Sequence, residues 1–395
     1  MAQRSAQIPT VGARVPALDG IRGLAVTAVL LFHANLLANQ QAPLDKAIGT
    51  VLAFGWVGVD VFFVLSGFLI TGILIDSRHE PGYFSRFYAR RALRIMPVYY
   101  ALLIVLFVAA VVVYPPSWSE TVLRPQAWYW SYLTNWWFAR SNGRALFNSG
   151  HLWSLAIEEQ FYLVWPLIVI SATRSSTRTL RWLCGAIVIA SPVARWLLLR
   201  NGFGPYTIYL ATFTRLDGLA AGAWLACVAR EFTGGLGALR AFARWGAPIA
   251  ACGAIAVAAM QHSPEALGPA MLVVGLTLVT CAAAAWIVLI CTDEPHAFHS
   301  RVLSHPFLRR LGTHSYAIYL VHYPLILLLR ETGSTWLDAV PRIGVSDLPR
   351  QIVLVISLAA ATYAVARLTW FLIELPMLRL KRFVPYAWET GSAEG

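Results

Sequence analysis

Two polar residues interrupt the segment LDGIRGLAVTAVLLFHAN (residues 18–35) in a way that suggests chemistry. Arg22 and His33 are separated by eleven positions in an otherwise mostly apolar run. At about 100° per residue this spacing is only about 20° from three full helical turns, and the two side chains would lie about 16 Å apart along the axis. Imidazole transfers protons near neutral pH, and guanidinium binds anions. One helix face is therefore predicted to carry both functions.

Acidic side chains fall at a matching predicted depth in two other apolar segments. Asp60 lies in GWVGVDVFFVLSGFLIT, and Glu158 and Glu159 lie in HLWSLAIEEQFYLVWP. Counting inward from the outer ends of these segments at 1.5 Å per residue places the carboxylates about 10 Å deep, level with His33. A carboxylate beside an imidazole stabilises the imidazolium of a general base. We predict catalytic roles for these carboxylates and for His33, with either glutamate as its partner.

Arginines are concentrated in YFSRFYARRALRIMP, between two apolar segments. On a helix, Arg86, Arg90 and Arg94 would share one side, with Arg91 beside it. Planar guanidinium groups in this arrangement suit phosphate. Because loops on the cytoplasmic side of membrane proteins collect arginines in any case, a purely topological role is the alternative.

The elements that must position these residues are membrane helices. The chain of 395 residues is 58% hydrophobic and 13% charged, with a mean hydropathy of +0.61. Apolar blocks of about 18 or more residues are typical of transmembrane helices. We predict an all-α, polytopic integral membrane protein whose ten spans cover residues 20–39, 52–75, 95–114, 151–171, 181–200, 207–229, 246–262, 268–291, 314–330 and 351–375.

The basic residues indicate the orientation of these spans. The net charge is +12, and arginines and lysines are concentrated before the first span and after every even-numbered one. This alternation places both termini in the cytoplasm and requires no nucleic acid partner. The predicted organisation is a cytoplasmic segment at 1–19, a ten-helix transmembrane domain at 20–375 and a cytoplasmic tail at 376–395.

Two other sequence patterns, a possible signal peptide and the cysteines, have simpler explanations. Residues 24–37 could be the core of a signal peptide followed by ANQQA as a cleavage site, but the late start and the embedded histidine argue against cleavage. The five cysteines lie in or at the ends of apolar blocks without metal-ligand spacing. They are predicted to be packing residues, with no disulfide and no metal site.

Seven motifs, taken in order, resemble the membrane-bound acyltransferase 3 family. LDGIRGLAVTAVLLFH matches the family's signature of Arg or Lys, ten residues and His, and RRALRIMP contains its Arg-x-x-Arg motif at Arg91 and Arg94. The other five motifs are GVDVFFVLSGFLIT, WSLAIEEQFYLVWP, RLDGLAAG, SYAIYLVHYP and FLIELP. The family includes bacterial polysaccharide O-acetylases and macrolide O-acyltransferases.

The resemblance implies transfer of an acyl group, often acetyl from acetyl-CoA, to a hydroxyl acceptor. Arg91 and Arg94 then become donor-binding candidates, to which we add Arg22 and Arg90, and His33 becomes the catalytic base. We expect acyl-CoA as the donor substrate, with no permanently bound cofactor. A carbohydrate, a lipid-linked sugar or a macrolide is expected as the acceptor, and the bacterial cytoplasmic membrane as the location.

Five further polar residues in these motifs are supporting candidates: Ser66, Arg215, Asp217, His322 and Glu374. Asp217 and His322 could either lock helices by hydrogen bonding or handle protons. Ser66 could carry an acyl group, although its small neighbours favour close helix packing. Glu374 is expected to pair with a loop arginine.

A proton-coupled secondary transporter is the alternative function, because buried His, Asp and Glu residues also build proton relays. A transporter predicts inverted repeats with interrupted helices, and the sequence shows neither clearly. Some members of the acyltransferase family carry a fused extracytoplasmic esterase-like domain. We expect none after residue 375, so a separate extracytoplasmic acyl-transfer protein is a candidate partner.

Overall fold

A computed structural model describes residues 15–37, 42–113, 124–144, 149–174, 176–294 and 296–390. These residues form helices joined by turns, with no β-strand among them, which confirms the all-α prediction. Parts of several predictions lie outside the described residues: the first 14 residues of the N-terminal segment, the ends of the first and third predicted spans at 38–39 and 114, most of the ANQQA stretch at 38–41, and the end of the tail at 391–395.

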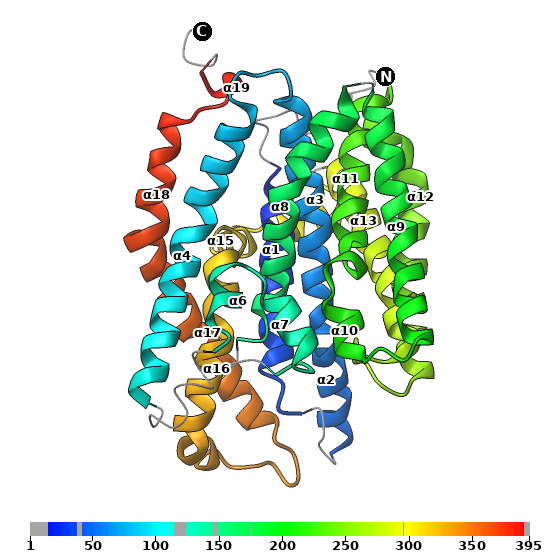
Figure 1. Cartoon of the computed structure of the whole chain (residues 1–395). Coiled ribbons are helices and arrows are strands. Elements are labelled where there is room, and N and C mark those ends of the chain that lie inside the picture. Colours follow the sequence, from blue (N-terminus) through cyan, green and yellow to red (C-terminus); the bar gives the residue numbers. More distant parts are fainter. Residues whose placement is uncertain are drawn as a thin grey trace.

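The first half of the bundle shown in Figure 1 contains α1 (Pro16–His33), α2 (Pro43–Ala53), η1 (Phe54–Trp56), α3 (Val57–Asp76), α4 (Tyr83–Val113), α6 (Gln126–Trp130), α7 (Thr134–Arg140), α8 (Leu152–Thr173) and α9 (Thr177–Arg200). The middle contains α10 (Pro205–Leu210), η2 (Thr212–Thr214), α11 (Leu216–Glu231), η3 (Gly235–Leu239), α12 (Arg240–Met260), η4 (Met271–Gly275) and α13 (Leu276–Thr292). The last part contains α14 (Phe298–Leu303), α15 (Pro306–Thr313), α16 (Ser315–Asp338), α17 (Leu348–Thr369), η5 (Trp370–Glu374), α18 (Leu375–Arg379), η6 (Leu380–Phe383) and α19 (Ala387–Thr390).

Most of the predicted spans are confirmed as helices. Eight helices in the described part of the chain are long and apolar enough to cross a membrane, and each corresponds to one predicted span. The ninth span coincides with a shorter apolar helix at Ser315–Arg330. The protein is therefore a polytopic membrane protein.

The sixth predicted span is a broken helix. Its helix stops at Leu210, and Ala211 has an extended backbone before η2 and α11 begin. Side chains reach the freed carbonyl oxygens: Asn135 donates to that of Leu210 at 3.0 Å, and the Thr214 hydroxyl, with one hydrogen to donate, lies 2.7 and 2.6 Å from those of Ile208 and Ala211. Irregular backbone is tolerated at membrane depth where it is buried in protein and hydrogen-bonded in this way.

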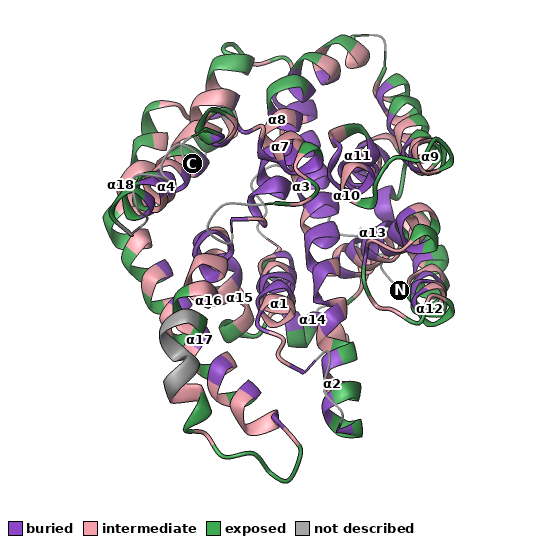
Figure 2. Ribbon diagram, turned by 60° about the horizontal axis from the view of Figure 1, so that its bottom comes forward, coloured by how far each residue is buried: buried purple, intermediate pink, exposed green. Residues whose placement is uncertain are grey.

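The central helix of the bundle is α3. Most of its residues are buried, and it packs against α1, α8, α11 and α13 (Figure 2). Glycines make the closest of these contacts possible, because a Cβ at Gly67 would overlap the Leu219 carbonyl oxygen and one at Gly222 would overlap that of Val64. Small residues let membrane helices approach in this manner.

Gly67→Ala is expected to destabilise the protein, because the added methyl group forces α3 and α11 apart. Overpacking of this kind costs about 1–3 kcal/mol. The midpoint of thermal unfolding in detergent measures the loss. Gly185→Ala in α9 is the control, since a Cβ there meets no other atom within 4 Å. Equal midpoints for the two variants would contradict the tight α3–α11 contact.

Both described ends of the chain lie at the same end of the bundle (Figure 1). Val15, just before α1, and Leu378 of α18 line one cavity there. This agrees with an even number of crossings, and the arginine distribution predicts that this end faces the cytoplasm.

Candidate active site

Three arginines from two helices face a single cavity inside the bundle. Arg22 of α1 and Arg91 and Arg94 of α4 line this cavity, whose volume is about 240 Å³. Much of the remaining wall consists of apolar side chains from α3, with Leu155 of α8 and Ile95 of α4. We call it the arginine cavity. It brings together three of the four arginines predicted to bind acyl-CoA.

These arginines form no close ion pair in the described part of the protein, although the charge of Glu158 acts on all three. Neither a hydrogen bond nor an ion pair joins Arg22, Arg91 or Arg94 to another described residue. The Arg91 guanidinium lies over the Tyr162 ring, 5.3 Å from its centroid, and 6.0 Å from the centroid of Phe87. Unpaired guanidinium groups in a partly desolvated site favour an anionic ligand.

The arginine cavity is also lined by oxygen groups close to the arginines. Glu158 and Glu159 of α8 both line it. One turn further along α8, the Tyr162 hydroxyl donates to Glu158 Oε2 at 3.3 Å and shares a hydrogen bond with the Ser66 hydroxyl. The arginines outnumber the two glutamates, so the cavity keeps an excess of positive charge.

A second cavity, of about 340 Å³, adjoins the first. Arg22 and Arg94 line both cavities, and Val15 and Leu378 line the second one near the ends of the described chain. Glu374 also lines it and makes no ion pair with any described residue, so the expected pairing with a loop arginine is not formed. The second cavity therefore connects the arginines with the end predicted to face the cytoplasm.

Arg90 does not join the other arginines. Its guanidinium donates to both carboxylate oxygens of Glu389, at 2.8 and 2.6 Å, and lies 4.6 Å from the centroid of the Tyr386 ring. Arg86 pairs instead with Glu80 at 3.2 Å. The expectation that Arg86, Arg90 and Arg94 act as one stack is therefore wrong.

The geometry of α4 explains this correction. Residues three apart and residues four apart on a helix both lie on the same side. Arg94 can therefore share a side either with Arg91, three residues earlier, or with Arg90, four residues earlier. The side that faces the cavity is the one containing Arg91, and packing of α4 against its neighbours makes that choice. Arg90 is thus placed outside the cavity, among C-terminal residues.

His33 is the last residue of α1 and lies outside both cavities. Its Nδ1 atom is 3.0 Å from Nε2 of His322, and its ring centroid is 4.3 Å from that of Tyr323. Neither Glu158 nor Glu159 contacts His33 among the described residues. The expected carboxylate partner is therefore replaced by a second histidine.

His33 and Glu158 do not lie at the same depth, contrary to the prediction, for a physical reason. The predicted first span continued to residue 39, but α1 ends at His33, while Glu158 lies two turns inside α8. Equal depth also leaves the direction of each side chain open. Glu158 points to the arginine cavity, and Asp60 points to α11.

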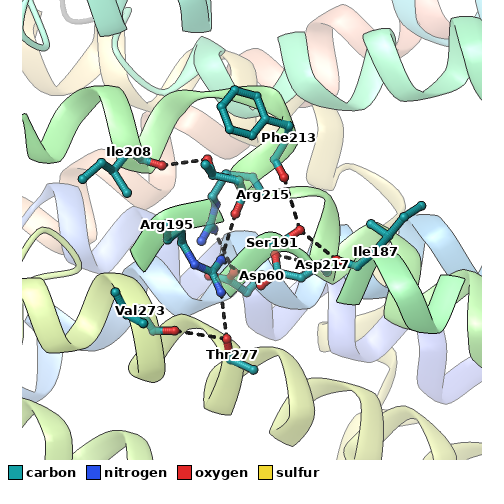
Figure 3. Close-up of polar contacts among 12 residues, drawn as sticks. Asp60, Ile187, Ser191, Arg195, Ile208, Phe213, Arg215, Asp217, Val273 and Thr277 are labelled. Carbon is teal, nitrogen blue, oxygen red and sulfur yellow. Dashed lines mark hydrogen bonds and ion pairs between the residues drawn. The ribbon is translucent and has the colours of Figure 1, made fainter. Parts of the chain in front are cut away.

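Asp60 belongs to a buried charge network that Figure 3 shows in detail. Arg215 donates from Nη2 to Asp60 Oδ1 at 2.8 Å, and Arg195 Nη1 lies 2.8 Å from Asp217 Oδ2. All four residues are at most 1% exposed. Three aromatic rings surround the Arg215 guanidinium, with centroid distances of 4.8 Å to Tyr209, 5.6 Å to Trp153 and 5.7 Å to Phe63.

This network ties the broken sixth span to its neighbours. Arg195 of α9 also donates to the Thr214 carbonyl oxygen at 2.8 Å and to the Thr277 hydroxyl at 2.7 Å (Figure 3). None of the four charged residues lines either cavity. The structure therefore places Asp60, predicted to be catalytic, and the supporting candidates Arg215 and Asp217 in a bundle-locking network.

The sequence of this chain also matches a known protein family. The family model described as an acyltransferase domain matches residues 15–371, nearly the whole chain. The chain belongs to the membrane-bound acyltransferase 3 family. This membership does not favour the transporter alternative. No solved structure matches the chain.

Curated relatives of this acyltransferase-family chain include proteins named as peptidoglycan O-acetyltransferases. Peptidoglycan O-acetyltransferase OatA of Listeria monocytogenes is 32% identical over 94% of this chain and 57% of its own length. Putative peptidoglycan O-acetyltransferase YrhL of Bacillus subtilis is 34% identical over 81% of this chain and 50% of its own length. The chain thus spans about half the length of these relatives.

Several residues around the acyltransferase-family motifs were missed by sequence reasoning. Ser154 and Tyr319 line the arginine cavity and share a 2.5 Å hydrogen bond, and the Tyr319 hydroxyl also donates to the His151 carbonyl oxygen at 3.0 Å. Serine and tyrosine are common in apolar helices, so their hydroxyl groups do not stand out in the sequence as charged residues do. The buried Arg195, in contrast, could have been found by the reasoning applied to the other charges inside spans.

Proposed function

We propose that this protein is an O-acyltransferase that moves an acyl group, expected to be acetyl, from cytosolic acyl-CoA to a carbohydrate hydroxyl. The observation that supports this best is that three guanidinium groups, on Arg22, Arg91 and Arg94, face one cavity and form no close ion pair with a described residue. Phosphate groups suit guanidinium donors, and the donor nucleotide carries several phosphates.

The second cavity supports donor entry from the cytoplasmic side. It adjoins the arginine cavity at Arg22 and Arg94 and extends to Val15 and Leu378. With its phosphates at the arginines, acyl-CoA would extend its pantetheine arm along the apolar wall. Tyr319 and Ser154 would then meet the thioester end, because they line the cavity and lie next to the histidines.

The proposed chemistry is one acyl transfer. His33 accepts the proton of the acceptor hydroxyl, and the hydroxyl oxygen attacks the thioester carbonyl carbon. The carbon–sulfur bond then breaks, and the CoA thiolate takes up the proton from His33. A positioned general base contributes about 10²–10⁴-fold to such a reaction.

The acceptor proposal rests on the relatives. Two of them are described as peptidoglycan O-acetyltransferases, so we propose a sugar hydroxyl of the cell envelope as the acceptor and the bacterial cytoplasmic membrane as the location. A separate extracytoplasmic protein is a proposed second recipient. Mass spectrometry of the envelope of a deletion strain tests this, and loss of an acyl mass from a polysaccharide is the expected result.

Arg94→Ala is expected to raise the KM for acetyl-CoA by about 10–100-fold, because a hydrogen bond to a charged group is worth about 1.5–3 kcal/mol. Release of free CoA by the purified protein in lipid nanodiscs measures it. Arg90→Ala is the matched control from the same helix, since Glu389 and not the cavity holds its side chain. An equal KM for both variants would contradict the donor site.

A further inference from the structure

The His322 side chain is fully buried, and both of its ring nitrogens lie within hydrogen-bonding distance of other atoms. Its exposed fraction is 0%. Nδ1 lies 2.6 Å from the Tyr319 carbonyl oxygen and 3.2 Å from that of Ile318, and Nε2 lies 3.0 Å from Nδ1 of His33. Contacts at both ring nitrogens therefore fix the orientation of the His322 ring. His322 lies on α16, which also carries Tyr323.

These contacts determine where the hydrogens sit. Carbonyl oxygens only accept hydrogen bonds, so Nδ1 of His322 must carry a hydrogen. In a neutral ring, Nε2 is then an acceptor, and the hydrogen between the two rings belongs to Nδ1 of His33. Consequently Nε2 of His33 holds a lone pair.

We infer that His322 is a positioning residue that fixes the Nδ1–H tautomer of His33 and leaves Nε2 as the atom that accepts the proton. This inference rests on the proposed role of His33 as the base. His322 does not touch the reacting atoms. It takes the place of the carboxylate that often orients a catalytic histidine.

The surroundings favour a neutral orienting group. The groups near the pair are the rings of Phe32, Tyr323 and His151, the Val29 backbone, to which the His33 ring hydrogen-bonds, and Arg330, whose Nη2 lies 3.4 Å from the His33 carbonyl oxygen. No carboxylate contacts His33 or His322 in the part of the chain that the structure describes. An ionised group at membrane depth is costly, so a second imidazole orients the first without burying a charge.

The inference assigns each proton in the proposed reaction. Nε2 of His33 takes the hydroxyl proton while the acceptor oxygen bonds to the acyl carbon. The Nδ1 hydrogen of His33 stays in place and continues to donate to His322. When the thioester bond breaks, Nε2 returns its proton to the leaving thiolate, and both rings are neutral again.

The first test reads the tautomer directly and needs no activity. Nitrogen-15 NMR of the full chain, labelled at histidine and held in nanodiscs at pH 8, distinguishes Nδ1–H from Nε2–H rings. The signals lost in His33→Gln identify His33, and we expect them to report the Nδ1–H form. An Nε2–H form or an imidazolium at His33 would overturn the inference.

The second test measures turnover. His322→Leu is expected to lower kcat by about 100-fold or more, since loss of the group that fixes the tautomer of a catalytic histidine costs about 10⁴-fold in a serine protease. The KM for acetyl-CoA should stay within about twofold, because His322 lies outside both cavities. His322→Gln keeps an acceptor for the Nδ1 hydrogen and should recover kcat to within about tenfold of the parent.

A control variant and two kinds of contrary result distinguish a failure of the positioning role from a failure of the proposed function. His79→Gln changes an exposed histidine in the turn after α3 and should leave kcat unchanged. A parent-like kcat in His322→Leu, or a kcat in His322→Gln as low as in His322→Leu, would overturn the positioning role. A parent protein that shows the Nδ1–H tautomer but transfers no acyl group would overturn only the proposed function.

Discussion

His33→Gln is expected to abolish acyl transfer while leaving acyl-CoA binding intact. Glutamine can still donate to Nε2 of His322, so the hydrogen bond between α1 and α16 is retained. It cannot accept the hydroxyl proton, and the lost general base should lower kcat by about 10²–10⁴-fold. His33 lines neither cavity, so the Kd for acetyl-CoA should be unchanged.

Two measurements on the same preparation check this expectation. Isothermal titration with acetyl-CoA gives the Kd, and transfer of a labelled acetyl group to a sugar acceptor gives kcat. Arg94→Ala should show the opposite pattern, with weakened binding and a smaller effect on kcat. Parent-like turnover in His33→Gln would remove His33 from the mechanism, whatever its effect on binding.

Asp60→Ala is expected to cause the largest loss of stability, about 3–5 kcal/mol in the free energy of unfolding. The substitution leaves the Arg215 guanidinium fully buried and without its carboxylate. It also releases α3 from the start of α11, next to the broken sixth span. Unfolding in detergent, followed by circular dichroism against increasing denaturant, measures the effect.

Two variants provide the controls for this prediction. Asp338→Ala removes an exposed partner that lies 3.6 Å from Arg350, and surface ion pairs contribute only about 0–1 kcal/mol. Replacing Asp60 with leucine and Arg215 with methionine together removes both buried charges, and it should cost much less than Asp60→Ala alone. If the double variant were as unstable as Asp60→Ala, the unpaired charge would not be the cause.

The charge network also bears on the shape of the donor cavity. Phe63 lines the arginine cavity and its ring faces the Arg215 guanidinium, and Val59 lines the same wall beside Asp60. The network thus supports that wall from behind without entering the cavity. Such a role fits a bundle-locking function for Arg215 and for Asp217, for which the sequence also left proton handling open.

Which arginines meet was only partly predictable. The Arg-x-x-Arg spacing pairs Arg91 with Arg94, and the cavity confirms that they lie together. The spacing along the helix predicts equally well that Arg90 lies beside Arg94, because residues three and four apart share a helix side. Only the packing of α4 against its neighbours turns Arg90 toward Glu389 and away from the cavity.

The amino-acid sequence by itself determined the membrane class, most of the spans and the set of polar residues that matter, because hydropathy and charge act locally along a helix. It did not determine which polar residues meet. Depth along a helix is one coordinate, whereas contact needs the rotation of each helix and the point where it ends. The tertiary structure decided that His33 meets His322, that Asp60 meets Arg215, and that Glu158 faces the arginines. Those choices arise from close packing between helices distant in sequence, which no local pattern records.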